Sequence, residues 1–294
     1  MGGSVETVYP PRRKNTKLLD NTTKTPKKMM ELNKIYNEDC LEGMKRIPDG
    51  SVDMVLCDLP YGITQLKFDV RLPFDKLWEQ WLRVCKTNAA IVLFSSQPFT
   101  TDLINSNRKM FKYEIVWKKT QATGFFNAKK APLRIHENII VFYDRLPTYN
   151  PIKQQKKGHV IVGRKIRNSD YKKITGGFMG KVGLGKADTW EYTEDGTRYP
   201  TDVIEYSNWN GALFGNLDRS VKHPTQKPVD LCEYLIKTYT NEGDTVLDNC
   251  MGSGTTAVAC INTGRNFIGF EIDEGYWKTS QQRIAEAMAN KTYE

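Results

Sequence analysis

The chain of 294 residues is long enough for one or two domains of ordinary size, and 39% of its residues are hydrophobic. Its longest apolar runs, such as residues 89–94 and 138–143, are far short of the roughly 20 residues needed to cross a bilayer, and the N-terminus lacks the apolar core of a signal peptide. With a net charge of +9 and a pI near 9.1, these features predict an intracellular protein with a polyanionic partner and no membrane contact.

Short apolar strands alternate with helical stretches along most of the chain. Residues 1–29 are polar and basic and have no apolar period, so they are predicted to form a flexible basic arm. Beyond the arm, the alternation indicates an α/β fold with a doubly wound, mostly parallel sheet that is covered on both faces. The expected strands are residues 34–40, 52–58, 89–96, 114–119, 138–144, 245–249 and 267–273, and the expected helices are residues 74–86, 229–240, 255–264 and 276–289.

Residues 145–222 break this alternation. They contain several prolines and a glycine-rich stretch, which predicts a loop-rich lobe inserted between two halves of the sheet domain, residues 30–144 and 223–294. The positive charge is concentrated there, because residues 118–190 hold sixteen Lys and Arg but only four Asp and Glu. Aromatic residues interleave with these charges, and this combination is typical of surfaces that bind nucleic acids.

The six cysteines and three histidines show no spacing that suits a zinc site, and no C-x-x-C pair occurs. We therefore expect buried, reduced thiols and no metal centre.

A strand, a glycine-rich loop and a helix follow one another near the C-terminus. Asp248 ends the strand, Gly252 and Gly254 permit a tight turn, and Thr255 opens the helix. Glu271 ends the next strand 19 positions after Gly252, close to the offset at which a carboxylate reaches ribose hydroxyls. No Gly-Lys-Ser/Thr follows the loop, and Asp248 would repel phosphate but accommodate a cation. A nucleoside with a positive group is expected, and S-adenosylmethionine fits that description.

The stretch "CDLPYG", residues 57–62, places an acid and an aromatic ring around a proline directly after an apolar strand. With the glycine-rich loop, it resembles the motifs of the β-class of S-adenosylmethionine-dependent DNA amino-methyltransferases, the adenine-N6 and cytosine-N4 methylases, and most of all the phage-type and bacterial site-specific adenine enzymes. The matching segments are "DLPYG" (58–62), "DNCMGSGTT" (248–256), "IGFEID" (268–273), "NEDC" (37–40), "HPTQKP" (223–228) and "RIHENIIVFY" (134–143).

The resemblance covers residues 31–290 and implies a Rossmann-like class I methyltransferase fold with permuted motif order. It gives catalytic roles to Asp58, Leu59, Pro60 and Tyr61, with Leu59 standing where the family usually has proline. The residues expected at the cofactor are Asp39, Asp248, Gly252, Gly254, Thr255, Glu271, His223, Thr225 and Lys227. Residues 30–144 would form the catalytic half, residues 223–294 the cofactor-binding half and residues 145–222 the lobe that recognises the target site. The residues expected at DNA are Lys129, Lys130, Arg134, His136, Lys156, Lys157, Arg164, Lys165, Arg167, Lys172 and Lys173.

Asp58 would assist a poorly nucleophilic amino nitrogen. Hydrogen bonds from its N–H groups to the Asp58 carboxylate and the Leu59 carbonyl would draw the nitrogen towards tetrahedral geometry and aim its lone pair at the methyl group. Tyr61 would stack on the target base, which must leave the duplex. An aspartate here favours adenine over cytosine, where the family more often has serine. The predicted function is therefore site-specific methylation of the N6 atom of a flipped-out adenine in DNA.

Several different functions stay open at this point. Attack on cytosine C5 by Cys57 is disfavoured because burial and the adjacent acid would raise the pKa of the thiol. Cytosine-N4 methylation, an RNA substrate and a non-catalytic nucleic-acid-binding relative stay open as well. The expected partner is double-stranded DNA, in the cytoplasm of a bacterial or phage-infected cell, and the sequence leaves open whether a separate cognate restriction endonuclease exists. Monomer and homodimer are both compatible with the sequence.

Overall fold

The computed structural model describes residues 30–62, 69–156, 165–167, 191–193, 195–208 and 226–292. The predicted arm, residues 1–29, lies outside the described residues. None of the helices within these ranges is long and apolar enough to cross a membrane.

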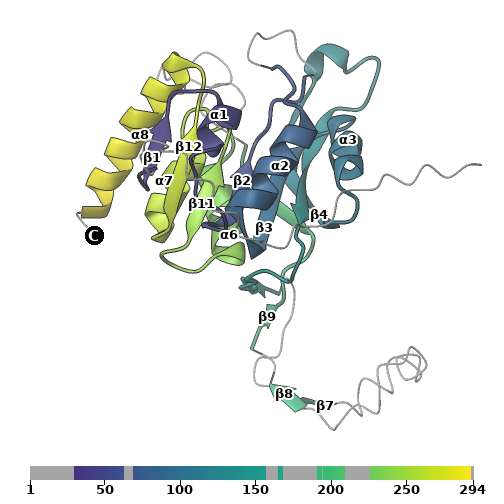
Figure 1. The fold of residues 1–294 in the computed structure, drawn as a ribbon. Helices are drawn as coiled ribbons and strands as arrows, with labels where there is room; N and C mark the ends of the chain where they lie inside the picture. The colour runs from purple at the N-terminus through teal and green to yellow at the C-terminus, as the bar shows by residue number, and fades with distance from the viewer. Residues whose placement is uncertain are drawn as a thin grey trace, which may run out of the picture.

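The centre of the molecule is an eight-stranded sheet with the strand order β1-β12-β11-β2-β3-β5-β4-β10 (Figure 1). All the strands expected from the sequence pair in it, together with one strand that was not expected. The strands are β1 (Lys34–Tyr36), β2 (Val52–Cys57), β3 (Cys85–Ser95), β4 (Phe111–Thr123), β5 (Arg134–Phe142), β10 (Val203–Tyr206), β11 (Thr245–Asp248) and β12 (Asn266–Phe270).

Most strands of the sheet run in the same direction. Only β5 is antiparallel to its two neighbours, β3 and β4. The carboxyl ends of β1, β12, β11, β2, β3 and β4 and the start of β5 therefore lie at one edge of the sheet, which we call the carboxyl edge. This arrangement confirms the predicted α/β class and the mostly parallel sheet, and it brings the motifs that follow β2, β11 and β12 together.

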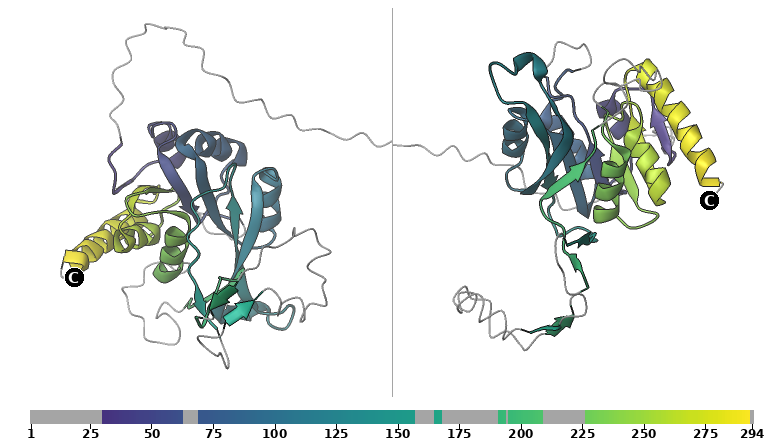
Figure 2. Two further views of the ribbon diagram at one scale, coloured as in Figure 1. Left: turned by 90° about the horizontal axis from the view of Figure 1, so that it is seen from below. Right: turned by 180° about the vertical axis from the view of Figure 1, so that it is seen from behind.

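Helices cover both faces of the sheet (Figures 1 and 2). Alternate residues of a strand point to opposite faces, so Met54 and Leu56 pack in one hydrophobic cluster while Val55 and Cys57 pack in the other. The first cluster includes α6 (Val229–Tyr239), α7 (Thr255–Thr263) and α8 (Glu274–Thr292), and the second includes α1 (Cys40–Met44), α2 (Phe74–Val84) and α3 (Phe99–Ser106).

The structure corrects several of the expected elements. The strand expected over residues 34–40 ends at Tyr36, because the Asp39 carboxylate accepts hydrogen bonds from the backbone of the next residues and caps the short helix α1. Helix α3 and strand β10 were not expected. The thiols are free, as expected, and all are buried except Cys250, which is half-buried.

The predicted lobe of residues 145–222 is only partly described. Two short ladders belong to it: β6 (Gln154–Gln155) pairs with β9 (Thr197–Arg198), and β7 (Lys165–Arg167) pairs with β8 (Glu191–Thr193). Figures 1 and 2 place these strands beyond the end of the sheet opposite the carboxyl edge. Strand β10, however, pairs with β4, so the residues Val203–Tyr206 within the predicted lobe belong to the main sheet.

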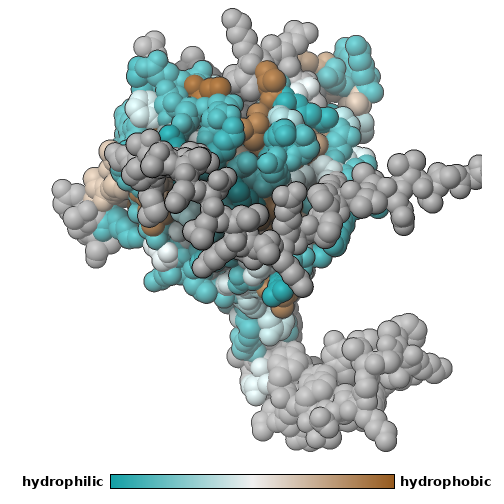
Figure 3. Space-filling view, viewed as in Figure 1, coloured by the Kyte–Doolittle hydropathy of each residue, from teal (hydrophilic) through white to brown (hydrophobic). Residues whose placement is uncertain are grey.

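The side chain of Asn150 fastens the start of this lobe to α6. Its amide donates hydrogen bonds to the carbonyls of Lys237 and Thr240, which are two of the last groups of that helix. The surface seen in Figure 3 is mainly hydrophilic, with only small hydrophobic patches.

Candidate active site

The catalytic turn predicted over residues 58–62 begins where β2 ends, at the carboxyl edge. The Tyr61 hydroxyl donates a hydrogen bond to Asp58 Oδ1 at 2.9 Å. Gly62 has φ of +66°, a left-handed conformation that favours glycine, and its backbone N–H donates to Asp69 Oδ1. Leu59 is buried in the cluster beneath. The turn therefore holds its acid and its aromatic ring in contact with each other.

Three largely buried charged side chains form a chain of ion pairs that starts at Asp58. Lys227 Nζ lies 2.6 Å from Asp58 Oδ2 and 3.4 Å from Glu137 Oε2, and Glu137 Oε1 pairs in turn with Lys119. Glu137 comes from the start of β5 and Lys119 from the middle of β4. Glu137 Oε2 has no hydrogen bond, so its separation from Lys227 Nζ is an ion-pair contact only.

These charges support one another in the folded protein. Burial alone would lower the pKa of Lys227, but the Asp58 and Glu137 carboxylates raise it above its usual range. Burial would raise the pKa of Glu137, but the Lys227 and Lys119 ammonium groups bring it below its ordinary value. Both groups are therefore charged at neutral pH despite their burial.

Aromatic rings line the same turn. Tyr61 stacks on Phe99 with ring centroids 4.8 Å apart, and Lys227 Nζ lies 5.9 Å from the Tyr61 ring centroid and 5.2 Å from that of Phe94. Burial, reinforced by the Asp58 charge, raises the pKa of the Tyr61 hydroxyl, so it stays protonated and can donate to Asp58. One face of the ring thus rests on Phe99, and stacking of Tyr61 on a target base stays a prediction.

The glycine-rich loop after β11 is organised by Asp248. Its Oδ1 atom accepts from the backbone N–H of Cys250 and its Oδ2 atom from the Thr256 hydroxyl, and the side chain is buried. Burial raises the pKa of Asp248 to about 6, although these hydrogen bonds oppose the shift. The carboxylate that was expected to accommodate a cation therefore lies inside the loop and bonds to the loop's own groups.

The two loop glycines have different surroundings. Both have positive φ, +54° at Gly252 and +86° at Gly254. A Cβ on Gly254 would lie 2.8 Å from the Cβ of Ser280 in α8, whereas a Cβ on Gly252 would meet nothing within 4 Å. Gly254 permits close helix packing, and Gly252 borders open space. The backbone N–H of Gly252 donates to Glu271 Oε2 at 2.7 Å, so the predicted ribose-binding carboxylate touches the loop.

Residues that the sequence analysis missed fix this loop from outside. Arg283 of α8 donates to the Ser253 carbonyl and to the hydroxyls of Ser253 and Thr255, all through Nη1. Trp81 of α2 donates to Asn249 Oδ1 at 3.0 Å. An arginine on α8 and a tryptophan on the buried face of the amphipathic helix α2 give no sequence signal of such contacts.

The segment before α6 connects the two halves of the site. The Ser253 hydroxyl donates to Gln226 Oε1 at 3.0 Å, and the next residue, Lys227, binds Asp58. The predicted cofactor residue Lys227 is thus in contact with the catalytic turn. Two further predicted cofactor residues, His223 and Thr225, lie outside the described residues.

Asp39 lies in the turn between β1 and α1, where it caps the helix. The neighbouring Asn37 side chain donates to the carbonyl of Glu271, and the backbone N–H of Glu271 donates to the Tyr36 carbonyl. The turn that holds Asp39 and the end of β12 therefore lie side by side, as a single cofactor site would require.

The basic residues predicted to bind DNA fall into three groups. Lys129, Lys130, Arg134 and His136 are exposed on the hairpin that joins β4 and β5. Lys156 is half-buried beside the β6–β9 ladder, where its backbone N–H donates to the Gly196 carbonyl. Lys165 and Arg167 lie on β7, and Lys157, Arg164, Lys172 and Lys173 lie outside the described residues.

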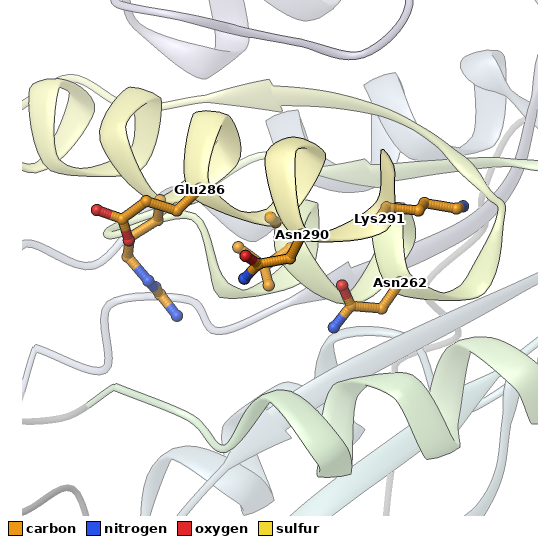
Figure 4. A pocket seen from close by; sticks show the side chains of 7 residues that line it. Asn262, Glu286, Asn290 and Lys291 are labelled. Carbon is orange, nitrogen blue, oxygen red and sulfur yellow. The ribbon is translucent and has the colours of Figure 1, made fainter. Parts of the chain in front are cut away.

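A pocket between α7 and α8 lies apart from the catalytic turn. Figure 4 shows Glu286 and Asn290 of α8 and Asn262 of α7 around this space. Two of its polar side chains are engaged within the protein, since the Asn262 amide donates to Glu233 and the Lys291 ammonium to the Ile261 carbonyl. The pocket is a gap where α7 and α8 pack against each other. Among its lining residues, Arg283 donates a hydrogen bond to the glycine-rich loop.

The fold and the paired motifs at the carboxyl edge define a class I methyltransferase, and comparison with known proteins identifies its family. Residues 52–282, most of the chain, match the family model described as DNA methylase, which covers the adenine-N6 and cytosine-N4 enzymes, and the chain belongs to this family. Enzymes of this family use S-adenosylmethionine as methyl donor, so the predicted family and cofactor are confirmed.

Individual relatives align along most of the chain. Type II methyltransferase M.BglII of Bacillus subtilis is 30% identical over 86% of this chain and 69% of the relative. DNA adenine methyltransferase YhdJ of Escherichia coli (strain K12) is 29% identical over 86% of this chain and 83% of the relative.

Solved structures share the fold. The M1.HpyAVI–SAM complex has a TM-score of 0.54 and 24% identity and covers 85% of this chain and 98% of that chain. PvuII DNA methyltransferase, which is cytosine-N4-specific, has a TM-score of 0.57 and 16% identity and covers 92% of this chain and 96% of that chain.

Proposed function

We propose that this chain is a site-specific DNA adenine-N6 methyltransferase that acts on a flipped-out adenine in double-stranded DNA. The observation that carries the proposal is the position of Asp58, which follows β2 and is held by Lys227 directly beside the cofactor loop. Strand β2 pairs with β11, which leads into that loop, and Gln226 and Lys227 contact the loop and the turn from one short segment.

The residues at the carboxyl edge fit a nucleoside that carries a positive sulfonium group. Glu271 presents a carboxylate at the end of β12, where ribose hydroxyls are bound in nucleotide-binding βαβ units. Gly252 borders open space, so a ligand can approach the backbone there. Glu271 and Gly252 would hold the adenosine part, Asp39 would lie near its base, and the buried charge of Asp248 would favour the cationic end.

When bound, S-adenosylmethionine supplies an electrophilic methyl group with a neutral thioether as leaving group. The protein's part is to prepare the amino nitrogen that accepts it. The Asp58 carboxylate and the Leu59 carbonyl would accept hydrogen bonds from the two N–H groups, which localises the nitrogen lone pair. Lys227 and the Tyr61 hydroxyl fix the direction of the Asp58 carboxylate before substrate arrives, so little reorganisation is needed.

Cytosine-N4 methylation is the second candidate, because both bases carry an exocyclic amino group with similar chemistry. The family contains enzymes of both kinds, and the cytosine-N4-specific PvuII methyltransferase shares the fold. The named relative YhdJ is an adenine enzyme, and an aspartate at position 58 supports adenine in this chain.

A nucleoside digest decides between these functions. Mixed-sequence duplex DNA and RNA are incubated with the protein and S-adenosylmethionine, digested, and analysed by liquid chromatography and mass spectrometry. We expect N6-methyladenine in the DNA digest alone, and none from the Asp58→Ala variant, which should still bind the cofactor. Methylcytosine would move the assignment to the N4 branch, and the absence of any methylated base would support a non-catalytic nucleic-acid-binding protein.

A further inference from the structure

The hairpin between β4 and β5 exposes two adjacent aromatic side chains at its tip. Phe125 and Phe126 lie in a short 3-10 helix, Phe125–Asn127, with exposed fractions of 65% and 105%. Large apolar side chains normally lose such exposure on folding, and side by side they form an apolar projection rather than isolated surface residues.

The backbone that carries these two rings forms a hydrogen-bonded turn. Gly124 adopts φ of +95° and begins the 3-10 helix, and successive backbone hydrogen bonds follow: Asn127 to Gly124, Ala128 to Phe125, and Lys130 to Asn127. The loop therefore has a defined turn structure of its own, although no part of the core packs against the Phe126 side chain.

The hairpin rises from the catalytic site. Strand β4 runs towards the carboxyl edge and β5 runs back from it, so the tip points away from the sheet on the side of Asp58 (Figures 1 and 2). Lys119 and Glu137, at the base of this stem, belong to the charge chain that reaches Asp58. The stretch from Lys119 to Thr123 spans about 13 Å in a strand, which exceeds the depth of about 8.5 Å of the DNA major groove.

The charge of the hairpin suits a polyanion. Residues 115–136 contain no Asp or Glu, whereas Lys129, Lys130 and Arg134 are exposed beside the two rings. A basic stem with an apolar tip matches the chemistry of duplex DNA, with phosphates outside and stacked bases within.

We propose that Phe125 and Phe126 form a wedge that enters the base stack of duplex DNA at the position the target base has left. This inference rests on the proposed function, because the stack has a vacated position only where a base leaves the helix. Lys129, Lys130 and Arg134 bind the flanking phosphates, and Phe126, the more exposed ring, replaces the stacking that the flipped base gives up. The wedge stabilises the opened duplex and takes no part in methyl transfer itself.

The test compares two duplexes that differ only in the cost of opening the target pair. One carries the methylation site, mapped by sequencing DNA modified by the wild-type protein, and the other carries the same site with the target base mispaired. Phe126→Ala should lower the initial rate on the paired duplex about tenfold or more and change the rate on the mispaired duplex less than threefold. Phe126→Trp should retain most activity. Leu82→Ala, which removes a half-exposed side chain from α2, is the matched control.

Equal rates of Phe126→Ala and wild type on the paired duplex would overturn the wedge, and so would equal losses on both duplexes. A change in oligomeric state of Phe126→Ala in sedimentation would also overturn it, by showing that the rings contact a second copy of the chain. Failure of the wild-type protein to modify the DNA that is used to map the site would overturn the proposed function, and the wedge with it.

Discussion

Lys227 and Asp58 are 169 positions apart in the sequence, yet Lys227 Nζ lies 2.6 Å from Asp58 Oδ2 in the interior of the site. The pair joins the turn after β2 to the segment that leads into α6, and Glu137 extends it to β5. Removing one member of a buried ion pair leaves the others without compensation, so the pair has consequences for stability as well as for chemistry.

Lys227→Met should reduce the free energy of unfolding by about 3 kcal/mol at pH 8, the lower end of the range for a buried pair, because the largely buried Glu137 and the partly exposed Asp58 lose their ammonium partner. The raised pKa of Lys227 means that its contribution is complete below its ordinary value of 10.5 and is lost only as pH rises through the folded value. The lowered pKa of Glu137 means that its contribution is present above 4.5 and is lost as pH falls through the folded value.

Urea unfolding at pH 8 and near pH 4 measures this effect, and the difference between variant and wild type should shrink at the lower pH. Lys237→Met is the matched control, since that lysine pairs with Glu233 on the exposed side of α6 and should cost less than about 1 kcal/mol. An equally small loss for Lys227→Met would contradict the role of the charge chain.

Glu271→Ala should weaken binding of S-adenosylmethionine by about 1.5–3 kcal/mol, the range of a charge-assisted hydrogen bond. Titration calorimetry measures the affinity directly, without DNA. Glu274→Ala, which removes an acid from the first turn of α8 where it pairs with Lys278, is the control and should bind normally. Unchanged affinity in Glu271→Ala would place the ribose contact elsewhere.

Asp248→Asn should gain stability over wild type as pH rises. The folded-state pKa of Asp248, about 6, exceeds its ordinary value of 3.8, so the stability it contributes is greatest below pH 3.8 and is lost as pH rises through 6. An amide is neutral throughout, and the difference between the two proteins should change by up to about 3 kcal/mol between pH 4 and pH 7. Parallel denaturation curves at both pH values, with exposed Asp75→Asn as control, test this, and a constant difference would refute it.

Gly254→Ala should destabilise the protein more than Gly252→Ala. Both substitutions place a side chain at positive φ, at a cost of about 1–2 kcal/mol, but only the first brings a Cβ to 2.8 Å from Ser280. We expect an additional loss of about 1–3 kcal/mol, measured by thermal unfolding. Adding Ser280→Gly to Gly254→Ala should restore most of that excess, and a failure to do so would mean that contact with Ser280 is not its cause.

The sequence was informative where a functional residue directly follows an apolar strand. Asp58, Asp248 and Glu271 each end or follow such a strand, so the pattern predicted their position at one sheet edge, while their roles stay predictions. Glu137 and Lys119 could not be paired in this way, because their contact depends on the register of β4 against β5.

Contacts between elements that are distant in the chain could also not be predicted from the sequence. The sequence suggests that Asp248 faces a ligand, but its side chain turns inward and accepts a hydrogen bond from Thr256 in the loop. The sequence also suggests that Arg283 is an ordinary surface charge of a helix, but its side chain donates to the Ser253 carbonyl of that loop. Strand β10 was not predicted, because its four residues lie within a loop-rich region and are too few to show the alternation of a strand.

The β6–β9 ladder sets Gln154 opposite Arg198. The connection between these residues therefore begins and ends at the same place, the β6–β9 ladder. Under the proposed function, changes of sequence or length in this connection should leave Asp58, Lys227 and Glu271 in place, because these residues lie at the carboxyl edge and the β6–β9 ladder lies beyond the opposite end of the sheet.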